Sequence, residues 1–149
     1  MKNKIFKLAY ILILFFIPIS SNSQEQFNFD ITQIDILDNG NKFVGTKRGT
    51  ITSNNGIVIN ANEFEYNKKL NILKAKGNVK IVDEINNYEI YSKNVTYEKN
   101  NDFIFTNKES KAIDPKKGME INADIFEYNI IKNIITAKNN ATVENKLEN

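Results

Sequence analysis

Three acidic residues are the first candidates for chemistry in this chain. Glu63 and Glu65 are two positions apart, and Glu127 follows Glu65 by 62 residues. Two carboxylates on one surface could supply the acid and the base of glycoside hydrolysis. Glu63 and Glu65 alternate with Phe64 and Tyr66, however, so in a strand they point away from the aromatic face. The pattern favours a solvated surface over a catalytic pair.

The rest of the composition also argues against catalysis. The chain contains no histidine and no cysteine, which removes the commonest general base, the thiolate nucleophile and two common metal ligands. Asp83 and Glu84 lack the spacing of a calcium loop, and Gly45 and Gly49 lack the context of a phosphate loop. We therefore predict no catalytic residue, no metal site, no cofactor and no enzyme.

Residues 1–23 have the pattern of an export signal. Three lysines precede an unbroken apolar run at residues 8–17, and Ser21 and Ser23 provide small residues for cleavage after Ser23. The run is about half of the roughly 20 residues that a membrane-spanning helix needs. We predict a signal peptide at 1–23 and an exported domain at 24–149 in a bacterial periplasm. An uncleaved N-terminal anchor is the alternative.

Removal of the signal changes the charge balance. The full chain has 20 Lys and Arg against 18 Asp and Glu, and three of the lysines lie before Ser23. The exported domain therefore has 17 basic and 18 acidic side chains, a net charge of about −1. No basic patch remains that predicts nucleic-acid binding.

The chain is built from repeats. Residues 57–82 and 119–144 align without a gap at a shift of 62 residues, and both contain the short sequences NA and FEYN. Half of that shift, 31 residues, relates Ile59 to Ile90 and Tyr66 to Tyr97, so the intervening stretch is a diverged copy. A weaker fourth copy covers residues 27–53. A fixed short period predicts stacked structural units.

Each copy divides into two extended segments separated by turn residues. These segments are residues 57–67 and 71–83, 88–98 and 102–113, and 119–129 and 133–144. Apolar and polar residues alternate within them, as between Leu73 and Ile81, which is the period of a half-buried strand. We predict an all-β fold of about eight strands: an elongated, twisted β-jelly roll or solenoid of stacked antiparallel hairpins.

The apolar face of these segments is the candidate functional surface, since one hairpin cannot bury its apolar face alone. The predicted inner-face residues are Ile57, Ile59, Ala61, Phe64, Tyr66, Leu73, Ala75, Val79, Ile81, Ile90, Val95, Tyr97, Phe103, Phe105, Ile121, Phe126, Tyr128, Ile135, Ala137 and Val143. Small and large residues are mixed, which suits either a packed core or a ligand groove. The two open ends of such a stack leave edge strands available for pairing.

Residues 60–81 (NANEFEYNKKLNILKAKGNVKI) resemble the OstA-like repeat of lipopolysaccharide transport proteins, a family that includes soluble LptA and the N-terminal periplasmic domain of LptD. The phrase AKGNVKI at residues 75–81 carries the likeness, which extends over most of 27–145. The later copy departs from it at Asn139 and Ala141. The resemblance implies a slightly open β-jelly roll, an apolar groove for the acyl chains of lipopolysaccharide, and head-to-tail joining with similar domains.

Three functions follow as hypotheses. The first is a non-enzymatic conduit that shields lipid A acyl chains, located in the periplasm and associated with outer-membrane assembly. The second is a structural β-solenoid scaffold or adhesin fragment with a packed core. The third is an enzyme built on a β-helix, which the absence of a catalytic cluster disfavours. Lipopolysaccharide and neighbouring domains of the same kind are the expected partners.

Overall fold

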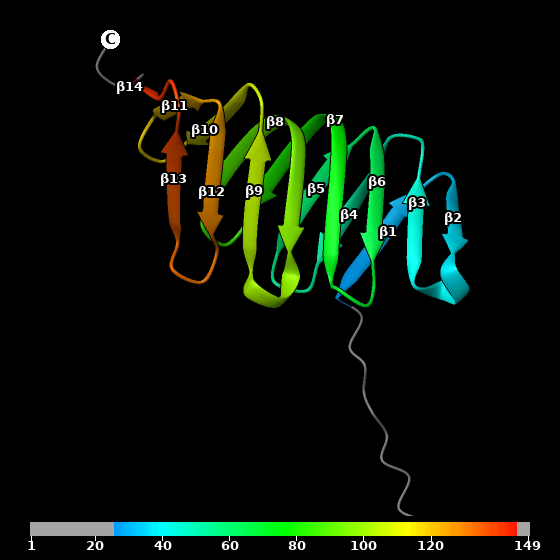
Figure 1. Ribbon diagram of the computed structural model, residues 1–149. Coiled ribbons are helices and arrows are strands. Elements are labelled where there is room, and N and C mark those ends of the chain that lie inside the picture. The colour runs from blue at the N-terminus through cyan, green and yellow to red at the C-terminus, as the bar shows by residue number, and fades with distance from the viewer. Residues whose placement is uncertain (1–25, 146–149) are drawn as a thin grey trace, which may run out of the picture.

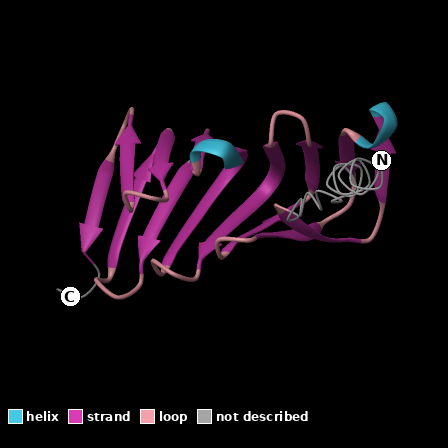
Figure 2. Cartoon of the chain, turned by 90° about the horizontal axis from the view of Figure 1, so that it is seen from below, coloured by secondary structure: helices cyan, strands magenta, loops and turns pink. Residues whose placement is uncertain are grey.

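Alternating apolar and polar residues form strands through nearly all of residues 26–145, the part of the chain described by a computed structural model (Figure 1). The predicted signal peptide at 1–23 lies outside the described residues. Figure 2 shows that strands dominate, interrupted by two single-turn 3-10 segments, η2 (Asp38–Gly40) and η3 (Lys99–Asn101). No helix among residues 26–145 is long and apolar enough to span a membrane.

The strands form two walls that share two long strands (Figure 1). Wall 1 contains, in order, β1 (Phe27–Ile31), β4 (Gly49–Ser53), β5 (Ile57–Ala61), the second half of β7 (Ile72–Asp83), the first half of β8 (Tyr88–Glu98), β10 (Ser110–Asp114), β11 (Met119–Ala123) and β14 (Thr142–Asn145). Wall 2 contains β2 (Ile34–Leu37), β3 (Lys42–Gly45), β6 (Glu63–Asn67), the first half of β7, the second half of β8, β9 (Phe103–Asn107), β12 (Ile125–Asn129) and β13 (Ile134–Lys138). All pairings are antiparallel.

The all-β prediction is confirmed, but the sheet has 14 strands, which exceeds the predicted eight. The difference arises because each extended segment bends at a corner between the walls. Only β7 and β8 pass the corner as single strands, and β7 does so through a bulge between Lys76 and Val79. The other twelve strands are six segments, each broken in two at its corner.

The 31-residue repeat is a repeat of backbone conformation. Residues with positive φ recur at this interval in the corners (Gly77 and Asn78, Lys108 and Glu109, Asn139 and Asn140), in the turns of wall 1 (Gly56, Asn87, Gly118) and in the turns of wall 2 (Gly40, Asn71, Asp102, Asn133). Asn139 therefore keeps the corner conformation of Gly77, since asparagine tolerates the left-handed region better than most residues. Gly77 has a second constraint: a Cβ there would lie 2.9 Å from Asn62 Nδ2.

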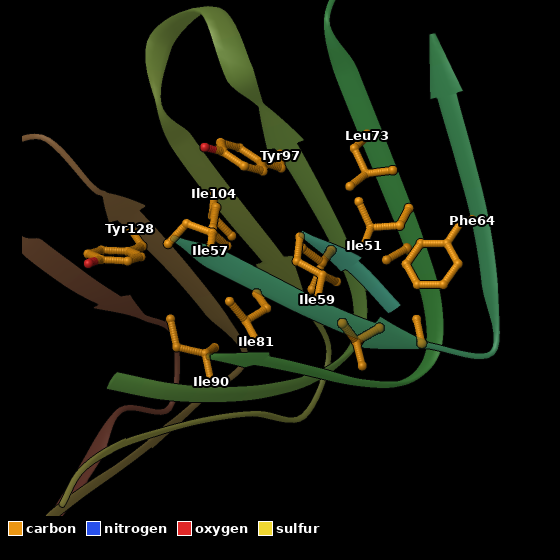
Figure 3. Close-up of a cluster of buried hydrophobic side chains, with 14 of the residues drawn as sticks. Ile51, Ile57, Ile59, Phe64, Leu73, Ile81, Ile90, Tyr97, Ile104 and Tyr128 are labelled. Atoms are coloured by element: carbon orange, nitrogen blue, oxygen red, sulfur yellow. The ribbon is translucent and has the colours of Figure 1, made fainter. Parts of the chain in front are cut away.

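The core fills the space between the walls (Figure 3). Ile51, Ile81, Tyr97, Ile104 and Phe126 have no accessible surface at all. At the N-terminal end of this interior, aromatic rings pack against one another. Their contacts are Phe27 with Tyr66 at 5.0 Å, Phe29 with Phe43 at 5.6 Å, and Phe27 with Tyr97 at 5.6 Å between ring centroids.

At the C-terminal end, inner-face apolar residues stay partly open. Ile121, Ile135 and Ala137 pack against the core without being fully buried. Val143 on β14 pairs with Ile121 and is 64% exposed. Partly buried apolar side chains therefore occur at both ends of the interior, with clustered aromatic rings at the N-terminal end and the exposed Val143 at the C-terminal end.

Candidate functional site

Most of the predicted inner-face residues line the interior. Buried there are Ile57, Ile59, Ala61, Phe64, Tyr66, Leu73, Ala75, Val79, Ile81, Ile90, Val95, Tyr97, Phe126 and Tyr128. These side chains come from both walls and form one cluster, part of which is drawn in Figure 3. In the central part their close packing leaves them in contact with one another.

Phe103 and Phe105 do not lie on the inner face, contrary to the sequence-based prediction. Ile104 and Thr106 are the buried residues of β9, and Ile104 pairs in register with both Tyr97 and Tyr128. The two phenylalanines face outward, with ring centroids 4.8 Å apart. The repeat relates Phe103 and Phe105 to Ile72 and Lys74, which lie outside the inner face of β7, and relates Ile104 to the buried Leu73.

Five buried core residues were absent from the prediction: Phe27, Ile51, Ile104, Ala112 and Ala123. Three of them had a signal in the repeat, since Ile104, Ala112 and Ala123 lie 31 or 62 residues after Leu73, Ile81 and Ala61. Phe27 and Ile51 belong to the weak first copy, where the repeat gave little guidance.

The walls meet again on the side opposite the corners, which we call the mouth, where turns of wall 1 face turns of wall 2. The first contact there joins Asn55, in the turn between β4 and β5, to wall 2. Its Nδ2 donates to Asp102 Oδ1 at 2.9 Å and lies 3.0 Å from the Tyr97 hydroxyl oxygen. The Tyr97 hydroxyl donates to the same Asp102 oxygen at 2.8 Å. We call this group the first latch.

The second latch lies one repeat further along the mouth. Asp83 ends the wall 1 part of β7 and is 1% exposed. Its Oδ2 accepts a hydrogen bond from the Tyr128 hydroxyl of wall 2 at 2.5 Å and one from Asn86 Nδ2 at 2.9 Å. Its Oδ1 accepts from the backbone N–H groups of Ile85 and Asn86. A buried carboxylate is thus satisfied by four donors, one of which crosses the mouth.

Both latch tyrosines are held in the neutral form. Burial, and then the hydrogen bond to Asp102, raises the pKa of Tyr97 well above that of an ordinary phenol. Burial, and then the hydrogen bond to Asp83, does the same to the pKa of Tyr128. A neutral hydroxyl can donate to a carboxylate, whereas a phenolate would repel it.

These pKa shifts predict an alkaline limit to stability. Unfolded tyrosine ionises near pH 10, so above that pH the unfolded chain loses protons that the folded chain retains. We expect the free energy of unfolding to be unaffected by these phenols below about pH 10 and to fall by up to about 1.4 kcal/mol per pH unit for each above it. Urea unfolding from pH 8 to 11.5 measures this. The variant with Tyr97→Phe and Tyr128→Phe should show a shallower decline, and equal declines would contradict the prediction.

The third turn of wall 1, residues 114–118, lacks a latch among the described residues. Asp114 lies one repeat after Asp83 and accepts hydrogen bonds from the N–H groups of Lys116 and Lys117. In place of a tyrosine contact, a pocket of about 130 Å³ separates this turn from β13 of wall 2. It is lined by Tyr88, Ala112, Ile113, Asp114, Lys117, Met119, Ile121 and Ile135.

The three glutamates considered for catalysis lie outside the interior. Glu65 pairs with Lys42 at 3.2 Å and Glu127 with Lys138 at 2.6 Å, each across neighbouring strands of wall 2, and Glu63 is exposed. Their surroundings are those of a solvated outer face. Within residues 26–145, no group of three acidic side chains is arranged to hold a metal ion.

Comparison with solved structures identifies the architecture. The crystal structure of LptH from Pseudomonas aeruginosa, described as the LptA-homologous periplasmic component of a lipopolysaccharide transport device, superimposes with a TM-score of 0.68 and 12% sequence identity. The match covers 76% of this chain and 82% of LptH. No family model and no curated protein sequence matches the chain. The chain has the LptA-like β-jelly-roll fold.

Proposed function

We propose that this protein is a periplasmic component of lipopolysaccharide transport that shields lipid A acyl chains between wall 1 and wall 2. The observation that carries the proposal is an apolar interior that runs the length of an LptA-like fold and stays accessible at its C-terminal end. Each CH₂ group removed from water contributes about 0.8 kcal/mol, so an acyl chain of about a dozen carbons gains roughly 10 kcal/mol by entering such an interior.

Two independent features support the proposed location. The pattern of residues 1–23 is that of a cleaved export signal, and LptH, which has a similar fold, is a periplasmic component. Both support a site of action between the two membranes, in the route that supplies lipopolysaccharide to the outer membrane.

The proposal includes end-to-end association with other domains of this kind or with a second copy. The edges at the C-terminal end are β13 and β14, and those at the N-terminal end are β1 and β2. An unpaired edge strand has free N–H and C=O groups that a neighbouring strand can satisfy. Pairing in this way would also cover the exposed Val143 and extend the interior across the junction.

A structural scaffold is the second candidate. The close packing of the central interior favours it, because residues such as Ile59 and Ile81 are already buried without a ligand. A scaffold needs no bound lipid, whereas a carrier must hold one at some stage.

The native mass spectrum of the exported protein distinguishes the two. Protein isolated from the periplasm of a lipopolysaccharide-producing bacterium should carry additional mass corresponding to lipopolysaccharide or lipid A. The same protein refolded from denaturant without lipid provides the bare mass. Recovery of only the bare mass from the periplasm would favour the scaffold.

A further inference from the structure

The mouth is the side of the molecule at which the walls can separate most easily. At the corners the chain passes directly from one wall to the other, and β7 and β8 belong to both walls. At the mouth, backbone hydrogen bonds of the turns run within a wall, as from Glu84 N to Gly56 O in wall 1 and from Lys99 N to Asn71 O in wall 2. The two latches bridge the mouth through side chains, so opening there leaves the backbone hydrogen bonds of both walls intact.

The latches are more polar than the interior beside them. Asn55, Tyr97 and Asp102 form one bridge, and Asp83 and Tyr128 form the centre of the other. A side-chain hydrogen bond that opens toward water exchanges its partner for solvent, so its net contribution is smaller than the strength of the bond itself. These bridges can therefore hold the mouth closed and still release it, which a fully apolar seam would do less readily.

At the pocket beside residues 114–118, the two walls are already separated at the mouth. Its walls are largely apolar, with Ala112, Ile121 and Ile135 among them. Lys117, whose side chain is 67% exposed, and Asp114 also line the pocket, and Lys117 Nζ lies 3.6 Å from Asp114 Oδ2. Lys116 lies next to it in the same exposed turn. An apolar cleft beside an exposed turn that carries two lysines and one aspartate suits an acyl chain whose anionic headgroup stays at the surface.

We propose that this pocket is the first subsite for an acyl chain of an anionic lipid, and that the chain enters the interior sideways through the mouth as the Tyr128 and then the Tyr97 latch opens. The inference rests on the proposed function and adds a route to it. The pocket receives the chain end, and separation of the turns from residues 114–118 toward Asn55 extends the space along the interior. Tyr97 and Tyr128 are gating residues in this route, and they need no contact with the lipid headgroup.

A reversible lock across the mouth tests the route. The chain has no cysteine, so Asn55→Cys with Asp102→Cys introduces the only two thiols, which a short bis-methanethiosulfonate reagent can join. Uptake of fluorescently labelled lipopolysaccharide should slow at least tenfold in the locked protein and recover after reduction. The matched control is Lys74→Cys with Thr96→Cys, a cross-strand pair on the outer face of wall 2, whose linkage should leave uptake unchanged.

Weakening of the latches should have the opposite effect. Tyr97→Phe together with Tyr128→Phe keeps both rings in the core and deletes the hydroxyl contacts to Asn55 and Asp83 across the mouth, while the hydrogen bond from Asn55 to Asp102 remains. Loss of hydrogen bonds to carboxylates predicts an increase of about tenfold in the rate at which the mouth opens. Labelling of Val79→Cys, a buried interior position, by a maleimide measures that opening without any lipid.

The outcomes separate this inference from the proposed function. Normal uptake by the locked protein would show that lipid enters from an end and would overturn the side entrance while leaving the carrier function intact. Absence of uptake even by the unlocked protein would refute the carrier function and the route with it. Unchanged maleimide labelling in the double phenylalanine variant would overturn the latches. A variant with Ile135→Cys places a thiol in the pocket for maleimide labelling. Slower labelling of this thiol at higher protein concentration, without any lipid, would show that a second copy covers the pocket and would contradict the lipid subsite.

Discussion

Phe126→Ala is expected to reduce the free energy of unfolding by about 3–5 kcal/mol, the usual result of truncating a fully buried phenylalanine. Phe126 is 0% exposed and points from β12 of wall 2 into the interior, one strand from the C-terminal edge. The cavity left behind is enclosed by both walls, so little relaxation can fill it. Urea unfolding monitored by circular dichroism measures the loss.

Phe103→Ala is the matched control. Both phenylalanines occupy strands of wall 2 and both were predicted from sequence to point inward, but Phe103 lies on the outer face in partial contact with solvent. Its truncation should cost about 1 kcal/mol, the typical value for a partly exposed site. Equal losses for the two variants would contradict the inner and outer faces described for β9 and β12.

Asp83→Ala is expected to destabilise the fold by about 3 kcal/mol, because it leaves buried donors without an acceptor. The Asp83 carboxylate accepts hydrogen bonds from the Tyr128 hydroxyl, the Asn86 side chain and two backbone N–H groups. The midpoint and slope of urea unfolding provide the measurement.

Asp114→Ala distinguishes the contribution of the turn to stability from that of the latch. Asp114 holds the equivalent turn one repeat later through the N–H groups of Lys116 and Lys117, without a tyrosine across the mouth. Its replacement should cost about 1 kcal/mol, the value of an ordinary turn contact. A loss as large as that of Asp83→Ala would mean that the turn alone, and not the bridge to Tyr128, accounts for the effect.

The periodicity of the sequence was sufficient to predict the class of fold. The 31-residue repeat reappears as a repeat of positive φ at Gly56, Asn87 and Gly118, and the alternation from Leu73 to Ile81 became the inner and outer faces of β7. Strand number was not predictable in the same way. A corner such as that at Asn62 interrupts the backbone ladder without interrupting the apolar alternation, so one predicted segment becomes two strands.

The candidate site was predictable where the repeat was strong and failed at Phe103 and Phe105, whose repeat partners Ile72 and Lys74 are not inner-face residues. Ile59, Tyr66 and Tyr128 were placed correctly inside, whereas Phe103 and Phe105 were not. The latches could not be predicted, because they join residues from different repeats. Tyr97 meets Asn55, and Tyr128 meets Asp83, only because the walls curve toward each other across the mouth.

The central claim is that the space between the walls holds lipid, and site-specific photo-crosslinking tests it most directly. A small diazirine amino acid at Val79 would point into the interior, and the same group at Lys80, the next residue, would point outward from wall 1. After irradiation in cells that make lipopolysaccharide, the Val79 position should form a lipopolysaccharide adduct and the Lys80 position should not. Absence of an adduct at Val79 in a folded, exported protein, or equal adducts at both positions, would contradict the claim.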